Sequence, residues 1–229
     1  MSQQELVLIL FQVLVLVFAL SVHESAHAYV AMRLGDPTAY MLGRVTLNPI
    51  KHLDPVGSVI MPLLALFFHW PVLGWAKPCP VTPRNFRNYK RDDILVSLAG
   101  PASNLAMAII ALLLLIVLKH EGGGAAIGGL MGMEQDAGFD PNSLAMLAVA
   151  MLLYYGVTIN LVLFVFNLIP IPPLDGSHVL RQFLPYRVEQ IYNQIGMYGL
   201  FVLMLFGRSW IGSLYTPILG FFDRLLLSL

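Results

Sequence analysis

Long apolar stretches without a charged residue constrain this chain more than any other feature of its sequence. A helix needs roughly 20 residues to cross the hydrocarbon core of a bilayer, which is about 30 Å thick. The stretches near this length are residues 6–22, 94–118, 143–169, 191–207 and a weaker 209–222. Only 11% of the 229 residues are charged, compared with roughly 25% in soluble domains. The sequence therefore predicts an all-α integral membrane protein with about five transmembrane helices.

The first apolar stretch is predicted to stay in the protein rather than to be cleaved as a signal peptide. It lacks a basic n-region and a small-residue cleavage site, and its apolar pattern continues into a polar motif at His23. We expect this helix to cover about residues 5–34 and to end at Gly35, because Pro37 follows closely.

The other apolar stretches are predicted to complete a single membrane-embedded domain, residues 1–229. The core helices are expected at about 5–34, 94–118 and 143–169. Further C-terminal helices are expected at about 189–228.

Lysine and arginine residues are distributed unevenly between the connecting segments. The connections before residue 55 and before residue 94 are basic, whereas the loop at 119–142 is net acidic. By the positive-inside rule, the two basic connections belong in the cytoplasm. Both ends of the proline-interrupted segment 55–76 then lie on one side of the membrane, so we interpret it as re-entrant or interfacial. We expect a multi-pass protein of the cell membrane.

Two histidines near the end of the first helix predict a metal site. His23 and His27 are four residues apart, so on a helix they share one face and can bind one tetrahedral zinc ion. In H-E-x-x-H sites the glutamate, here Glu24, is not a ligand but transfers a proton of the attacking water. Ionisable residues inside a transmembrane helix are costly and usually mark function. The alternative is that these groups only hydrogen-bond to one another in the bundle.

Asp175 is the predicted third zinc ligand, because catalytic zinc sites usually use three protein groups and water. Three prolines precede it and must break the helix that ends near residue 169. The alternative is that Asp175 caps a short helix that follows it. If segment 55–76 does not span the membrane, His23, His27 and Asp175 all lie towards the cytoplasmic side. The charge pattern and the ligand assignment therefore require the same topology.

The sequence resembles the site-2 protease family of intramembrane metalloproteases. The segments that carry the resemblance are His23-Glu24-Ser25-Ala26-His27, Ala99-Gly100-Pro101-Ala102-Ser103-Asn104, and residues 167–176 with their Asp-Gly pair. The resemblance implies a three-helix catalytic core around one zinc ion, and cleavage of peptide bonds within or near transmembrane segments of membrane proteins. It indicates a minimal member, in which no PDZ domain or regulatory domain is expected.

The resemblance also implies roles for individual residues. The implied zinc ligands are His23, His27 and Asp175. Glu24 would be the catalytic base. Asn104 and Asn167 would contact the substrate backbone, and the Asn104 amide would stabilise the oxyanion. A helix-packing role for Asn104 beside small residues is an equal alternative.

Other polar residues near these motifs are interpreted as parts of loops. His52 and His178 are read as polar loop residues rather than as partners of the zinc ligands. Residues 44–48 could form an edge strand that pairs with an unwound substrate, but Pro49 and Pro55 fit a simple connector equally well.

Two other functions are compatible with buried histidines and an aspartate. A metal transporter would bind zinc in transit, but such proteins usually show paired repeats with matching broken helices, which this sequence lacks. A catalytically inactive scaffold would only bind membrane helices, and the intact Glu24 argues against it. The net charge of zero gives no indication of a nucleic-acid partner. The single cysteine, Cys79, excludes an internal disulfide and a cysteine-based zinc site.

Overall fold

A computed structural model describes residues 3–61, 76–130 and 141–229 of the chain. The described part is helical, with an isolated bridge and no β-strand, which confirms the predicted all-α class. The long helices are α1 (Gln3–Arg33), α4 (Tyr89–Leu118), α6 (Pro141–Asn167) and α8 (Tyr186–Ser228). The short elements are α2 (Thr38–Met41), η1 (Pro49–Lys51), η2 (Pro55–Ile60), η3 (Pro83–Asn85), η4 (Lys119–Gly123), α5 (Gly124–Leu130) and α7 (Asp175–Arg181).

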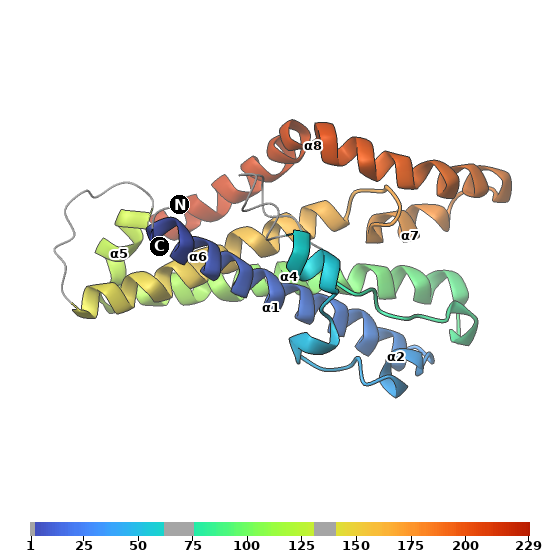
Figure 1. Cartoon of the computed structure of the whole chain (residues 1–229), viewed down its shortest axis with the longest axis horizontal. Helices are drawn as coiled ribbons and strands as arrows, with labels where there is room; N and C mark the ends of the chain where they lie inside the picture. The colour runs from blue at the N-terminus through green and yellow to red at the C-terminus, as the bar shows by residue number, and fades with distance from the viewer. Residues whose placement is uncertain (1–2, 62–75, 131–140) are drawn as a thin grey trace.

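Helices α1, α4 and α6 lie side by side, with α1 and α6 running in one direction and α4 in the other (Figure 1). By length and apolar composition, the helical stretches Leu6–Arg33, Tyr89–Gly128 and Leu144–Asn167 can each cross a membrane. These helices occupy the intervals predicted for the core. α4 begins earlier than expected because the Asn88 side chain accepts a hydrogen bond from Arg91 N and caps its first turn.

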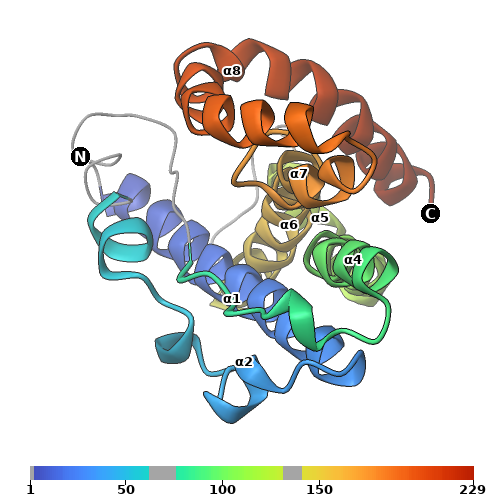
Figure 2. The same cartoon turned by 90° about the vertical axis from the view of Figure 1, so that its right-hand side faces the viewer.

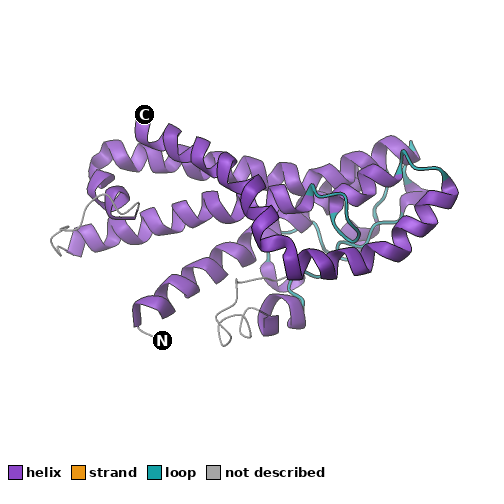
Figure 3. Cartoon of the chain, turned by 90° about the horizontal axis from the view of Figure 1, so that it is seen from above, coloured by secondary structure: helices purple, strands orange, loops and turns teal. Residues whose placement is uncertain are grey.

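Apolar side chains from four helices pack at the end of the bundle where α4 ends. Small residues of α4, Ala108 and Ala111, let α6 approach closely. Leu115 of α4, Leu161 of α6 and Leu226 of α8 are fully buried in this core. Many of the loops gather towards the other end of the molecule (Figure 3), where the predicted ligands lie.

Within the connection between α1 and α4, the residues on either side of positions 54–75 pair with each other. Leu53 and Ala76 form an antiparallel bridge, and Lys77 N donates a hydrogen bond to His52 O at 2.7 Å. The predicted re-entrant segment, 55–76, lies largely in residues 62–75, which are outside the described residues. The residues that flank this segment therefore lie side by side, and its re-entrant or interfacial character stays a prediction.

The C-terminal part differs from the prediction of separate helices at about 189–228. Residues 186–228 form one helix, α8, with Pro217 inside it, and Figure 1 shows that α8 changes direction along its length. A break was expected around Arg208, but arginine and serine are tolerated in a helix interior, and no proline follows at once. Within the described residues, three stretches can cross a membrane by length and composition, so the count of about five stays a prediction.

The turn that follows α1 is organised by Asp36, which is fully buried. Gly35 permits this turn because its φ is +110°, in the region that favours glycine. The Asp36 carboxylate accepts hydrogen bonds from the amide and the hydroxyl of Thr38. It also accepts from Thr82 N at 2.6 Å and from Asn85 Nδ2 at 2.8 Å. Asp36 therefore ties the end of α1 to the chain that leads into α4.

Replacing Asp36 with asparagine is expected to destabilise this junction. Burial by itself raises the pKa of the Asp36 carboxyl, but hydrogen bonds from Thr38, Thr82 and Asn85 outweigh it and hold the pKa below its ordinary value. The stability that this group contributes is therefore present above the unfolded-chain pKa of about 4 and is lost as the pH falls. Asp36→Asn should lower the unfolding free energy by about 1.5–3 kcal/mol at pH 7, and by less near pH 4, as measured by unfolding in detergent.

Asp54→Asn is the matched control for this substitution. Asp54 caps η2 by accepting hydrogen bonds from Val56 N and Gly57 N, and asparagine caps a helix as well as aspartate does. We expect a change within about 0.5 kcal/mol. Equal destabilisation by the two substitutions would contradict the special role of Asp36.

Candidate active site

The two histidines of α1 lie one turn apart on a buried face of the helix. His23 is 4% exposed and His27 is 7% exposed. Their Nε2 atoms are 3.0 Å apart, and the planes of the two rings cross at 82°. The helical spacing therefore brings the two nitrogens together, as predicted.

Asp175 reaches these histidines from the segment that follows α6. α6 ends at Asn167, and the chain folds back so tightly that a Cβ at Gly176 would lie 2.3 Å from the Leu168 carbonyl oxygen. Asp175 is the first residue of α7, but the capping position belongs to Leu174 and no side chain caps the helix. The structure therefore does not support the capping alternative for Asp175.

The short helix α7 is anchored to α4 at its far end. Arg181 Nη2 is 3.1 Å from Asp93 Oδ2, and Gln182 Nε2 donates a hydrogen bond to the same oxygen. Asp93 is only 3% exposed, so this ion pair is shielded from solvent. In the end-on view of Figure 2, α7 lies between α8 and the core helices.

Three potential ligand atoms converge at this point. Asp175 Oδ2 is 3.1 Å from His23 Nε2 and 3.4 Å from His27 Nε2. The same oxygen is buried and has no hydrogen-bond partner. A zinc ion holds nitrogen and oxygen ligands at about 2.0–2.1 Å in a tetrahedral arrangement, so neighbouring ligand atoms are about 3.4 Å apart. The spacing of the three atoms fits one zinc ion.

Hydrogen-bond acceptors on α4 occupy the other ring nitrogen of each histidine. His27 Nδ1 is 2.7 Å from Val96 O, and His23 Nδ1 is 2.6 Å from Asn104 Oδ1. With a proton on each Nδ1, both Nε2 atoms present lone pairs towards Asp175. Three acceptor atoms that face one another in a buried site need a cation to compensate them, which is a second reason why these residues fit a metal.

Gly100 provides the space in which the two imidazoles meet α4. A Cβ at this position would lie 2.3 Å from His27 Nε2 and 2.5 Å from His23 Nε2. Only glycine therefore lets α1 approach α4 closely enough for His27 to reach the Val96 carbonyl. The sequence analysis included Gly100 in a motif but assigned it no role at the site.

Glu24 lies beside the histidines and contacts the chain that leads into η3. Glu24 Oε2 accepts a hydrogen bond from Cys79 N at 2.8 Å. Arg44, which is buried, donates hydrogen bonds to the carbonyls of Lys77 and Pro78 and so holds this chain in place. Burial, together with the Glu24 carboxylate, raises the pKa of the Cys79 thiol to about 12. The thiol is therefore neutral at pH 7, and among the described residues Cys79 is not part of the group of potential ligands.

The two asparagines with predicted substrate contacts are placed differently. Asn104 is fully buried, and its amide nitrogen donates a hydrogen bond to Asn160 Oδ1 at 2.9 Å. Asn167 donates to its own helix, at Leu163 O. Substrate contact by either residue stays a prediction, and the hydrogen bonds of Asn104 connect it to His23 rather than to open space.

The remaining predictions concern the loops and His178. His52 is 1% exposed and contacts Thr46 O through Nε2, so it is a buried residue of the loop. His178 lies on α7, so its interpretation as a loop residue was wrong, and among the described residues it is not part of the group of potential ligands. Residues 44–48 form no strand within the described part of the chain, and Arg44 turns inward to bind backbone carbonyls. Pairing of this stretch with an unwound substrate stays a prediction, beside the alternative of a simple connector.

Asn160 was missed by the sequence analysis. It is 2% exposed in the middle of α6, and the available signal was a polar amide within an apolar helix.

Comparison with known protein families assigns the chain to one of them. Residues 81–207, more than half of its length, match the model of peptidase family M50, which is the site-2 protease family. The chain belongs to peptidase family M50. The matched region includes Asn104 and Asp175 but begins after His27, so the roles of the histidines depend on the geometry described above.

Curated relatives of this M50 protein are consistent with the family assignment. It is 40% identical to YwhC of Bacillus subtilis, a proposed zinc metalloprotease, over 89% of its own length and 82% of that protein. It is 28% and 30% identical to the Rip2 proteins of Mycolicibacterium smegmatis and Mycobacterium tuberculosis, which carry the same description. The chain spans 62% and 63% of the length of these two proteins. No solved structure matches it.

Membership of family M50 makes this protein a zinc metalloprotease of the site-2 type, with Zn²⁺ as its cofactor. Neither the family nor the relatives favour a metal transporter or an inactive scaffold.

Proposed function

We propose that His23, His27 and Asp175 bind the zinc ion of this M50 protein, and that the site hydrolyses peptide bonds within or near transmembrane segments of other proteins. The observation that carries the proposal is the convergence of His23 Nε2, His27 Nε2 and Asp175 Oδ2, at most 3.4 Å apart, in a buried position. The three residues come from α1 and α7, and acceptors on α4 orient the rings.

Glu24 is the proposed catalytic base. Zinc in this site supplies the Lewis acidity that activates water near neutral pH and polarises the scissile carbonyl. The Glu24 carboxylate accepts the proton of the attacking water and returns it to the leaving amine. The hydrogen bond from Cys79 N orients this carboxylate, and the buried surroundings limit access of bulk water.

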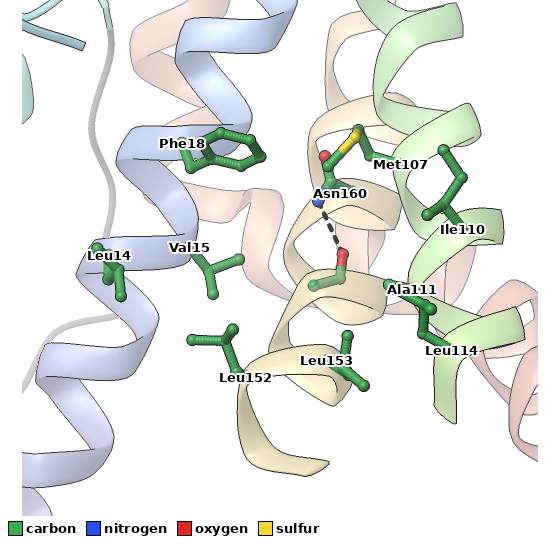
Figure 4. A pocket seen from close by; sticks show the side chains of 11 residues that line it. Leu14, Val15, Phe18, Met107, Ile110, Ala111, Leu114, Leu152, Leu153 and Asn160 are labelled. Atoms are coloured by element: carbon green, nitrogen blue, oxygen red, sulfur yellow. Dashed lines mark hydrogen bonds between the residues drawn. The ribbon is translucent and has the colours of Figure 1, made fainter. Parts of the chain in front are cut away.

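An apolar cavity between the core helices supports a transmembrane substrate. It measures about 340 Å³ and lies between α1, α4 and α6 (Figure 4). Leu14 and Phe18 form one wall and Ile110 and Leu114 the other, and each of these side chains is 45–59% exposed. The cavity therefore opens at the flank of the bundle that lipid would cover. Apolar side chains of a membrane-embedded segment suit it, and charged side chains do not.

The proposed location is the cell membrane, with several spans and the active site towards the cytoplasmic side. Three helices can cross a bilayer, and the end of α1 that carries the ligands leads into the basic connection with Arg33, Arg44 and Lys51. By the positive-inside rule this connection is cytoplasmic.

Metal removal and Asp175→Asn test the proposed site. Purified protein in liposomes should lose cleavage of transmembrane peptides on treatment with a strong chelator and regain it with one equivalent of zinc. Asp175→Asn should weaken zinc binding by at least about 100-fold, because even the loss of a group that only supports a ligand costs about 10–100-fold. Zinc content after dialysis and chelator competition measure the effect.

Asp54→Asn serves again as the control, because it makes the same chemical change in a carboxylate that only caps η2. It should retain zinc and activity. Undiminished zinc in Asp175→Asn would exclude Asp175 as a ligand, and cleavage that survives complete removal of the metal would exclude the mechanism.

A further inference from the structure

Three helices contribute to a chain of hydrogen bonds that ends at His23. His23 Nδ1 on α1 is 2.6 Å from Asn104 Oδ1 on α4. Asn104 Nδ2 donates to Asn160 Oδ1 on α6 at 2.9 Å, and Asn160 Nδ2 donates to Gly156 O at 2.8 Å. Both asparagines are nearly completely buried, at 0% and 2% exposure.

The direction of this chain is determined by its last member. A backbone carbonyl such as that of Gly156 can only accept a hydrogen bond, so the NH₂ group of Asn160 must point towards it. The Asn160 oxygen then faces Asn104, which must present its own NH₂ group to that oxygen. The Asn104 oxygen is thereby left facing His23 Nδ1.

The same logic extends to the imidazole of His23. An oxygen acceptor beside Nδ1 requires the proton on Nδ1, which leaves Nε2 unprotonated on the side of Asp175. In His27 the proton is held on Nδ1 directly, because this nitrogen faces the Val96 carbonyl. The partner described for His23 Nδ1 is instead a side-chain amide, Asn104, which is itself oriented by a second one, Asn160.

Without these hydrogen bonds, the apolar surroundings of Asn160 would make its burial energetically unfavourable. It is the polar side chain among the residues described as lining the apolar cavity, and Figure 4 shows it there, bonded to its own helix. A buried amide without partners costs about 1–3 kcal/mol. Both polar atoms of Asn160, however, are hydrogen-bonded in the chain that runs from Gly156 O through Asn160 and Asn104 to His23, which we call the relay.

We propose that Asn160 is a positioning residue for the metal site: through Asn104 it fixes the tautomer and the orientation of His23, so that Nε2 is free to bind zinc. The proposal rests on the proposed function of His23 as a ligand. It also assigns Asn104 to the support of His23 rather than to the oxyanion.

Asn160→Leu tests the relay, because leucine keeps the approximate volume and cannot hydrogen-bond. Without Asn160, the Asn104 amide can rotate and present NH₂ to His23 Nδ1. We expect zinc affinity, measured by chelator competition, to fall about 10–100-fold. The absorption spectrum of the Co²⁺-substituted protein should change with it, whereas circular dichroism should show that the metal-free variant stays helical.

Thr158→Val is the matched control on the same helix. Its hydroxyl bonds within α6, to Tyr154 O and Tyr155 O, so removing it perturbs the helix without touching the relay. Zinc affinity should be unchanged. An equal loss of affinity in Thr158→Val would show that the effect comes from α6 in general and would overturn the proposal.

The double substitution Asn104→Asp with Asn160→Leu provides a rescue. A carboxylate accepts through both oxygens, so Asp at position 104 needs no partner to face His23 Nδ1 correctly. The double variant should bind zinc more tightly than Asn160→Leu alone. Unchanged affinity in Asn160→Leu, or a folded double variant that binds no more tightly, overturns the relay. A wild-type protein that binds no zinc would instead refute the proposed metal site itself.

Discussion

Glu24→Gln is expected to lower kcat for a transmembrane peptide by about 10²–10⁴-fold while zinc binding stays unchanged. Glutamine has nearly the size of glutamate, and its amide oxygen can still accept the hydrogen bond from Cys79 N. It cannot take a proton from water. The loss should therefore appear in kcat and not in KM, in assays that compare both constants and the zinc content of the two proteins.

Glu189→Gln on α8 makes the same chemical change away from the site and should leave kcat, KM and zinc content at wild-type values. Two results would contradict the assignment of Glu24. Cleavage by Glu24→Gln at the wild-type rate would remove its role as base. Loss of zinc together with activity would mean that Glu24 acts as a ligand.

Gly100→Ala is expected to abolish both zinc binding and cleavage, although alanine is the better helix former by about 1 kcal/mol. The new Cβ would lie 2.3–2.5 Å from the Nε2 atoms of His27 and His23, well inside van der Waals contact. The rings cannot move aside without breaking their hydrogen bonds to Val96 O and Asn104. We expect zinc affinity to fall more than about 100-fold, since the ligands themselves are displaced.

Gly212→Ala on α8 controls for the effect of helix propensity. A Cβ there meets no atom within 4 Å, so this variant should bind zinc normally. Both variants should remain helical by circular dichroism. Normal zinc affinity in Gly100→Ala would mean that α1 and α4 can separate at the site without consequence.

The features of the candidate site whose geometry the structure confirms depend on spacing within one helix or on a strong local break. A spacing of four residues places His23 and His27 on one face whatever surrounds the helix, and three prolines end α6 wherever it packs. The pairing of Leu53 with Ala76 places the two flanks of the predicted re-entrant segment side by side, while the membrane topology inferred from charge stays a prediction. These signals come from neighbouring residues or from the summed charge of a segment, so they can be recognised in the sequence before any contact between helices is known.

The parts that were missed depend on how closely two helices approach. Nothing within α4 distinguishes Gly100 from any other small residue, and its role appears only when the imidazoles of α1 lie against it. Asn160 similarly acquires a role only because Asn104 faces it from another helix. Two apolar stretches, 191–207 and 209–222, predicted separate C-terminal helices, whereas residues 186–228 form one helix, α8, which changes direction along its length (Figure 1).

The proline segment before Asp175 packs against α8. This last helix therefore supports the candidate site, although it lies outside the three-helix core. Tyr192 of α8 donates a hydrogen bond to Pro170 O, and Gly196 packs so closely that a Cβ would lie 2.4 Å from Pro172. These contacts of α8 hold the segment that carries Asp175 in place. Shortening the chain to its core helices would remove them, so we expect a minimal catalytic fragment of this protein to extend at least through Gly196.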